Sequence, residues 1–201
     1  MKRVLLVLVF FISFSAASLS AWEANDLTKY PPCMTASNWI LNLGVGINPD
    51  WLDSIGEDYY WLPAFRLSFD KNTPIGDKKL PFFFGGLIGY TGYGFNHSDY
   101  GWHHHQIPLG FRIGYHFNWG VDGLDTYAVT TIGYTFGFTD NKDIEYNRKF
   151  SDDFFTYFNI GARWFISKGF GFWLEAGLHP FLILSHPRDA FGLDIGLAFK
   201  F

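Results

Sequence analysis

The strongest constraint on the fold is a repeated alternation between large apolar residues and small or polar residues. From Gln106 to Trp119, every second residue from Ile107 onward is large and apolar, and the intervening positions carry Arg112 and glycines. A period of two places successive side chains on opposite faces of an extended strand. The sequence therefore predicts strands with one apolar face and one small or polar face.

Eight segments follow this pattern, and we expect each of them to form one strand. Their ranges are 39–47, 60–69, 81–95, 106–119, 126–138, 154–166, 170–178 and 191–201. Two of them are irregular. Pro63 has no N–H donor, which predicts a bulge in the second segment. Large residues on both faces beside Gly85 and Gly86 predict a bulge in the third.

The apolar faces fit either the core of a soluble sandwich or the lipid-facing surface of a barrel. Aromatic residues make up 21% of the chain and charged residues 17%, which favours the lipid-facing interpretation. A closed barrel also leaves no unpaired strand edge in hydrocarbon. We predict an all-β fold, namely a transmembrane antiparallel up-and-down β-barrel of about eight strands.

The first residues have the features of a secretory signal. Lys2 and Arg3 precede an apolar stretch that is too short for a membrane helix, and small residues follow it. We expect a cleaved signal peptide at residues 1–20, an N-terminal periplasmic tail at 21–37 and the barrel at 38–201. These features predict the outer membrane of a Gram-negative-type cell as the location.

An even number of strands places both termini on the periplasmic side. The connections after odd-numbered strands are then extracellular, and those after even-numbered strands are periplasmic turns. The predicted outer loops are Asn48–Tyr59, Asn96–His105, Thr139–Asp153 and about Pro180–Ala190. The predicted periplasmic turns are Asp70–Leu80, Gly120–Asp125 and Ser167–Gly169.

Tryptophans lie near the ends of several predicted strands. Their rings prefer the boundary between lipid and water, so we expect an aromatic girdle. Its predicted members are Trp39, Trp61, Trp119 and Trp164. The net charge of −4 leaves no basic patch to neutralise phosphates, so no nucleic-acid partner is expected.

The last segment, from Phe191 to Phe201, resembles the C-terminal signal of outer-membrane barrels, which alternates apolar residues and ends in phenylalanine. That resemblance implies recognition by the barrel assembly machinery, with Phe201 as the key residue. The whole chain is similar in strand count and pattern to small eight-stranded barrels of the OmpW and OmpA-transmembrane families. An OmpW-like protein would pass small hydrophobic molecules. No motif aligns residue by residue, so no site residue is transferred.

Charged residues on the inward face form the first candidate site. They are Arg66, Arg112, Arg163, Glu175, Asp194 and Lys200. An eight-stranded barrel is only wide enough for side chains to fill, and buried ions must be paired. The hairpin at Lys168 places Arg163 diagonal to Glu175, within reach of a pair, or over the Trp173 ring. The cluster fits a structural network that fills the lumen or a gated, selective path.

Histidines near Trp102 form the second candidate site. His97, His103 and His105, with Asp99 and His104, fall in the predicted outer loop. Imidazoles at this density can bind zinc or copper, and the alternative is a polar interfacial loop. No other cofactor is expected.

An enzyme is the least favoured class, and we predict that the chain is not one. Lipid-modifying barrels need a serine within reach of a histidine and a carboxylate. In His97-Ser98-Asp99 and in Ser185-His186 these residues are adjacent, so in a strand they would point apart.

We expect a monomer that contacts outer-membrane lipids and lipopolysaccharide-type glycolipid. Its expected role is passive transport of small hydrophobic solutes or a structural role in the outer membrane. An adhesin-like barrel that binds through its outer loops is the alternative.

Overall fold

Each alternating segment forms a strand in the computed structural model, which describes residues 28–47, 59–97, 100–141, 153–178 and 191–201. The strands are β1 (Trp39–Ile47), β2 (Tyr59–Asn72), β3 (Phe82–His97), β4 (Tyr100–Phe117), β5 (Leu124–Asn141), β6 (Asp153–Phe165), β7 (Phe170–Leu178) and β8 (Phe191–Lys200). The predicted strand count is confirmed.

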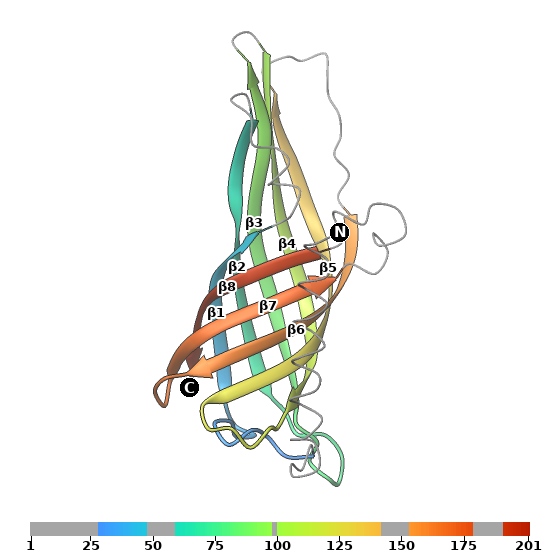
Figure 1. Ribbon diagram of the computed structural model, residues 1–201. Coiled ribbons are helices and arrows are strands. Elements are labelled where there is room, and N and C mark those ends of the chain that lie inside the picture. The colour runs from blue at the N-terminus through green and yellow to red at the C-terminus, as the bar shows by residue number, and fades with distance from the viewer. Residues whose placement is uncertain (1–27, 48–58, 98–99, 142–152, 179–190) are drawn as a thin grey trace, which may run out of the picture.

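The strands close into a barrel in simple chain order (Figure 1). Every strand pairs antiparallel with its neighbours in the sequence, and β1 pairs with both β2 and β8. The predicted up-and-down topology is therefore confirmed. The barrel end where β1 begins and β8 ends is called the terminal end below, and the opposite end is called the far end.

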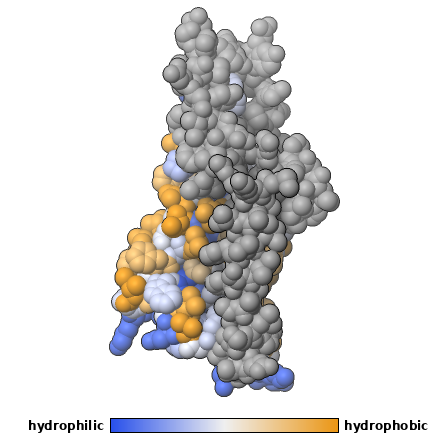
Figure 2. All heavy atoms as spheres, in the orientation of Figure 1, coloured by the Kyte–Doolittle hydropathy of each residue, from blue (hydrophilic) through white to orange (hydrophobic). Residues whose placement is uncertain are grey.

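The two faces of the strands differ as the alternation predicts. Large apolar side chains on the outer face, such as Leu43, Phe65, Phe111 and Ile195, are about half exposed. The space-filling view shows apolar residues over much of the outer face that is visible beside the grey atoms (Figure 2). Glycines and polar or ionic residues line the interior.

The strands differ in length around the barrel. β2, β3, β4 and β5 have 14 to 18 residues, whereas β1, β7 and β8 have 9 or 10. The long strands rise well beyond the short ones at the far end (Figure 1). The barrel wall is therefore tall on one side and low on the other.

The pairing of β2 with β3 is interrupted at one place. The register shifts between Leu62 and Phe65, which confirms the predicted irregularity at Pro63. The bulge predicted at Gly85–Gly86 is wrong, because these residues pair regularly with Asp70 and Phe69. Large residues occur on both faces of β3 because Phe83 fills the interior while Ile88 faces outward.

Several strands extend further than predicted. β4 begins at Tyr100, so His103 and His105 lie in a strand and the predicted Asn96–His105 loop is wrong. β2 runs to Asn72 and β5 begins at Leu124, which places Asp70 and Asp125 in the sheet instead of in turns. Charged residues are compatible with these strand ends because they point into a polar interior.

Residues 28–38 precede β1 at the terminal end, and some of their side chains pack into the barrel. Met34 is buried in a cluster with Ile40, Phe83 and Phe165. The Tyr30 hydroxyl donates to the Phe82 carbonyl at 2.8 Å. This segment, called the tail, therefore seals the terminal end.

The tail is held by polar contacts as well as apolar ones. Lys200 Nζ donates to the Cys33 carbonyl. Asn72 Nδ2 donates to the Thr35 carbonyl at 2.7 Å. Burial raises the pKa of Tyr30 to about 12 and the pKa of the Cys33 thiol to about 11. Both side chains are therefore neutral at physiological pH. The predicted signal peptide lies outside the described residues.

In the parts of the chain described here, no helix is long and apolar enough to cross a lipid bilayer.

Candidate functional site

Inward positions of five strands bring a set of ions together in the terminal half of the lumen. This set is called the plug, and it consists of Asp70, Arg112, Asp125, Arg163 and Glu175. All five residues are at most 1% exposed. They come from β2, β4, β5, β6 and β7, so the plug spans the interior of the barrel.

Arg163 lies at the centre of the part of the plug that is nearer to the terminal end. Its Nη1 donates to Asp125 Oδ2 and its Nη2 donates to Asp70 Oδ2, each at 2.8 Å. Its Nε donates to Asn42 Oδ1 at 2.9 Å. The guanidinium carbon lies 4.1 Å from the centre of the Tyr127 ring. The predicted pairing of Arg163 with Glu175 or Trp173 is replaced by these contacts.

Arg112 and Glu175 form the part of the plug that is nearer to the far end. Two nitrogens of Arg112 donate to the two oxygens of Glu175 at 3.2 and 2.8 Å. Tyr127 Oη and Asn159 Nδ2 also donate to Glu175, at 2.7 and 2.5 Å. Arg112 Nε lies 3.2 Å from Asp70 Oδ1, close enough for an ion pair although the two atoms are not aligned for a hydrogen bond. Asp70 therefore links both arginines.

His116, Asn72 and Trp173 complete the plug. His116 Nδ1 lies 2.6 Å from Asp125 Oδ1, and His116 Nε2 lies 3.0 Å from Asn72 Oδ1. Trp173 Nε1 donates to Tyr127 Oη at 2.7 Å. Removing one partner from such a buried network leaves a charge without compensation and costs about 3–5 kcal/mol. The plug is thus a closed layer whose members depend on one another.

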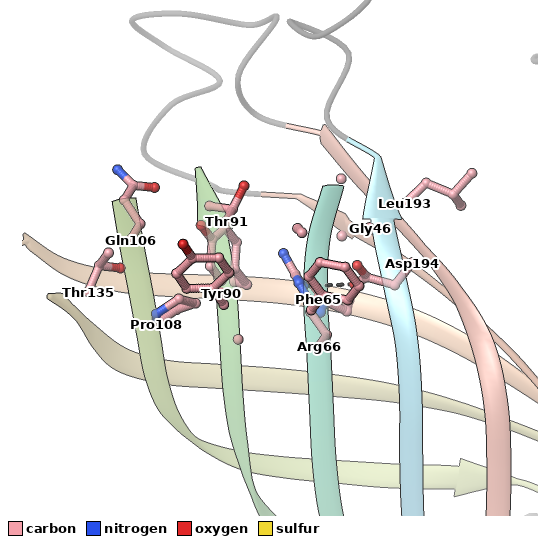
Figure 3. Close-up of a pocket in the computed structure, with 16 residues that line it drawn as sticks. Gly46, Phe65, Arg66, Tyr90, Thr91, Gln106, Pro108, Thr135, Leu193 and Asp194 are labelled. Carbon is pink, nitrogen blue, oxygen red and sulfur yellow. Dashed lines mark hydrogen bonds and ion pairs between the residues drawn. The ribbon is translucent and has the colours of Figure 1, made fainter. Parts of the chain in front are cut away.

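A cavity of about 150 Å³ lies on the far-end side of the plug. Figure 3 shows the residues that line it. This cavity is called the cup. Its lining includes Arg66, Gly89, Pro108, Tyr157, Asn159 and Asp194. Asn159 belongs to the floor, because its amide also contacts Glu175 of the plug.

Arg66 and Asp194 form the ion pair of the cup. Arg66 Nη1 donates to Asp194 Oδ2 at 2.8 Å. The Arg66 side chain is 20% exposed and that of Asp194 is 5% exposed, whereas Arg112 and Arg163 are 0% exposed. The Arg66 guanidinium also lies 5.8 Å from the centre of the Tyr157 ring. The cup therefore presents one accessible cation.

Glycines on the cup wall keep the cavity open. Gly46, Gly89, Gly177 and Gly192 all line it. A Cβ added at Gly192 would meet no described atom within 4 Å, so this position faces open space. A larger side chain at Gly192 would therefore occupy the cup without a clash.

The side wall of the cup is thin between β2 and β3. An apolar groove on the outer surface, lined by residues such as Leu43, Leu67 and Ile107, shares four lining residues with the cup. The shared residues form two adjacent cross-strand pairs, Phe65↔Tyr90 and Arg66↔Gly89. These pairs lie directly beside the register shift, where the strand pairing is already interrupted.

The remaining predicted lumen and assembly residues lie near the terminal end. Lys200 does not join the plug, because its Nζ binds the tail and lies 4.4 Å from the centre of the Phe165 ring. Phe201 exchanges backbone hydrogen bonds with Trp39 at 2.9 and 3.1 Å. Recognition of Phe201 by an assembly machinery stays a prediction.

Three of the predicted girdle residues lie near the terminal end. Trp39 and Trp164 are exposed on the outer face. Trp39 stacks on Phe69 with 4.8 Å between the ring centres. Trp119 lies just after β4 and donates through Nε1 to Thr126. The Trp61 side chain falls outside the described residues.

The histidines are not gathered into a metal site. His104 is buried in the interior, which places His103 and His105 on the opposite face of β4. The His105 ring stacks between Tyr90 and Phe138, with ring centres 5.9 and 5.0 Å away. Among the described residues, no group of three His, Cys, Asp or Glu residues can hold a metal ion. The side chain of His97, as well as Ser98 and Asp99, lies outside the described residues.

Sequence reasoning missed several members of the plug. Asp70 and Asp125 fell in predicted turns, although each continues the inward alternation of its strand. His116 and Asn159 also lie at buried inward positions of their strands. Extending the period of two to both strand ends would have found the two carboxylates.

No protein-family model matches the chain. No curated protein is similar to it in sequence. Among solved structures, the outer membrane protein OprG from Pseudomonas aeruginosa is similar, with 14% identity, a TM-score of 0.50, and coverage of 88% of this chain and 99% of OprG. At this identity the likeness shows the fold alone, a small outer-membrane-type barrel, as the sequence predicted.

Two further structures are similar. A de novo designed transmembrane β-barrel has 14% identity and a TM-score of 0.42, covering 84% of this chain and 98% of the design. The N-terminal β-barrel domain of Pseudomonas aeruginosa OprF has 11% identity and a TM-score of 0.44, covering 83% of this chain and 98% of that domain.

Proposed function

We propose that this chain is an outer-membrane β-barrel protein that admits small, mainly apolar solutes into the cup and releases them sideways into the bilayer. The lumen carries no through-flow, because the plug blocks it. The far end faces the outside, and the tail faces the periplasm. The protein acts without catalysis.

The outer surface supports a membrane location. Half-exposed apolar side chains cover the strands, and Trp39 and Trp164 lie near the terminal end as interfacial anchors. The shortest strands have 9 or 10 residues, which matches the length that a tilted strand needs to cross a bilayer. OprG, which shares the fold, is an outer membrane protein.

The position of the cup is the observation that carries the proposal. Its floor is a closed ionic layer, so a solute that enters from the far end cannot continue along the axis. Its side wall next to the outer apolar groove consists of the pairs Phe65↔Tyr90 and Arg66↔Gly89. Separation of these two pairs would join the cup to the groove. The interrupted register beside them lowers the number of backbone hydrogen bonds that must break.

Uptake of a small apolar probe tests the proposal. We would reconstitute the protein into vesicles whose outer leaflet is lipopolysaccharide and measure entry of radiolabelled toluene. The variant Gly192→Leu fills the cup and is expected to reduce uptake to the rate of protein-free vesicles. Gly86→Leu is the matched control, because Gly86 is exposed and an added Cβ there makes only an ordinary contact.

The two variants separate a role of the cup from a general effect of leucine. If Gly192→Leu takes up toluene as fast as the wild type, or if both variants lose uptake equally, the cup is not the entry site. A planar-bilayer recording provides the second readout. We expect no ion conductance from the wild-type barrel, and a steady open channel would contradict the blocked lumen.

A further inference from the structure

We infer that the cup selects a small organic carboxylate, with the acid group on Arg66 and an apolar body of about six carbons beside it. This inference rests on the proposed function, because it names the class of solute that the cup receives. It is carried by the accessibility of Arg66, the burial of Asp194 and the size of the cavity.

Arg66 has unused hydrogen-bonding capacity inside the cup. A guanidinium carries five N–H donors in a fixed fork that matches a carboxylate. Among the described residues, Arg66 makes one hydrogen bond, from Nη1 to Asp194. The Arg66 side chain lines the cup and is 20% exposed. Arg112, by contrast, already binds both oxygens of Glu175.

The exposure of the pair favours an anion over a cation as ligand. Asp194 lines the same cavity and would repel an anion, but only 5% of its side chain is exposed, against 20% for Arg66. The Asp194 oxygen nearest to Arg66 is also already engaged at 2.8 Å. A ligand that enters the cup therefore meets the guanidinium before it meets the carboxylate.

The rest of the cup fits a small apolar body. Pro108, Ala64 and the Tyr157 ring line it together with glycines, and its lining also includes the polar side chains of Thr91, Gln106, Thr135 and Asn159. The cavity measures about 150 Å³. In another protein, an engineered apolar cavity of about 150 Å³ binds benzene. A ring or chain of about six carbons is thus the upper size for the apolar part.

Three probes of equal size and different charge test the inference. Binding of benzoate, benzamide and benzylammonium would be measured by NMR titration of the wild-type protein in nanodiscs, with empty nanodiscs as the blank. We expect benzoate to bind about tenfold more tightly than benzamide, because hydrogen bonds to an ionic partner are roughly twice as strong as neutral ones. Benzylammonium should bind least.

Two variants test the role of Arg66. Arg66→Gln combined with Asp194→Asn removes both charges at once, so no unpaired ion remains in the cup. This double variant should lose the preference for benzoate over benzamide. Arg66→Lys keeps the positive charge and should keep part of that preference. Benzamide binding by each variant shows that the cup is intact.

The outcomes separate the inference from the proposed function. Equal binding of benzoate and benzamide, or tightest binding of benzylammonium, overturns the inference, while toluene uptake that Gly192→Leu blocks would still support the proposed function. A preference for benzoate that survives in the double variant also overturns it. An Arg66-dependent preference without toluene uptake supports the carboxylate site and contradicts transport. Absence of binding by all three probes overturns the inference.

Discussion

The plug and the cup are built from the same pair of residue types, arginine and carboxylate, at inward positions of the barrel strands. In the plug, Arg112 and Arg163 are 0% exposed and contact three carboxylates. In the cup, Arg66 has one carboxylate partner and is accessible. The difference shows that the inward alternation alone does not decide whether an ion pair fills the lumen or faces a ligand.

The neighbours of each pair account for the difference. Tyr127, Trp173 and Phe83 are buried around the plug and occupy the space that water would need. Glycines such as Gly192 take the corresponding wall positions around the cup. Large residues in one half of the lumen therefore favour stability, whereas small residues in the other half leave room for a solute.

The largest predicted effect comes from removing the carboxylate that links both arginines of the plug. Asp70→Ala deprives Arg163 of a partner at 2.8 Å and Arg112 of one at 3.2 Å. We expect a loss of about 3–5 kcal/mol in the free energy of unfolding, because both buried arginines lose an ion-pair partner at once and each keeps a single carboxylate. Urea titration of the protein in lipid vesicles would measure it. A loss below about 1 kcal/mol would mean that the plug is not a mutually dependent layer.

The second prediction concerns the tail, which closes the terminal end of the barrel. The pKa of the Cys33 thiol is raised from 9.0 to about 11, mainly by burial and then by the nearby charge of Asp125. A raised thiol pKa means less thiolate at a given pH, so at pH 8 the folded protein should react with iodoacetamide about a hundredfold more slowly than the urea-unfolded chain. The rate should rise about tenfold per pH unit up to about pH 11. Equal rates for folded and unfolded protein would show that the tail does not seal the barrel.

The third prediction compares two glycines with different surroundings. At Gly114, an added Cβ would overlap with the Phe83 ring, whereas at Gly192 it would meet no described atom. Gly114→Ala should lower the free energy of unfolding by about 1–3 kcal/mol through overpacking, and Gly192→Ala should change it by less than about 0.5 kcal/mol. The same urea titration measures both. Equal effects would remove the packing difference between plug and cup.

The smallest effect is expected at the ion pair of the cup. Asp194→Ala leaves Arg66 without its partner, but the guanidinium is accessible and water can solvate it. We expect a loss of about 1 kcal/mol, well below that of Asp70→Ala. A loss as large as that of Asp70→Ala would show that the cup pair belongs to the structural network.

Much of the fold followed from local pattern. The eight strands and the inward position of Arg112 and Arg163 depend on a period of two, and the irregularity at Pro63 depends on the missing N–H donor of that residue. The strand ends were harder to predict, because Asp70 and Asp125 have low strand propensity and depend on their ion pairs with Arg163.

The ion-pair partners of the plug residues could not be predicted from the sequence. Arg163 was expected near Glu175, which lies one strand away, yet it binds Asp70 from β2 on the opposite side of the lumen. Such contacts depend on the stagger of all strands around the closed barrel, a property that no single hairpin contains. The cup was likewise not foreseen, because its volume reflects glycines on several strands at once.

The closed state of the plug bears on how many copies of this barrel a membrane can carry. An open pore adds leak in proportion to its abundance, so its number per cell is limited by loss of ions and osmolytes. Because the five ions of the plug are at most 1% exposed, each additional copy of this barrel adds no aqueous path. On the proposed function, its abundance can then follow the supply of its solute, and the permeability barrier of the cell sets no limit on it.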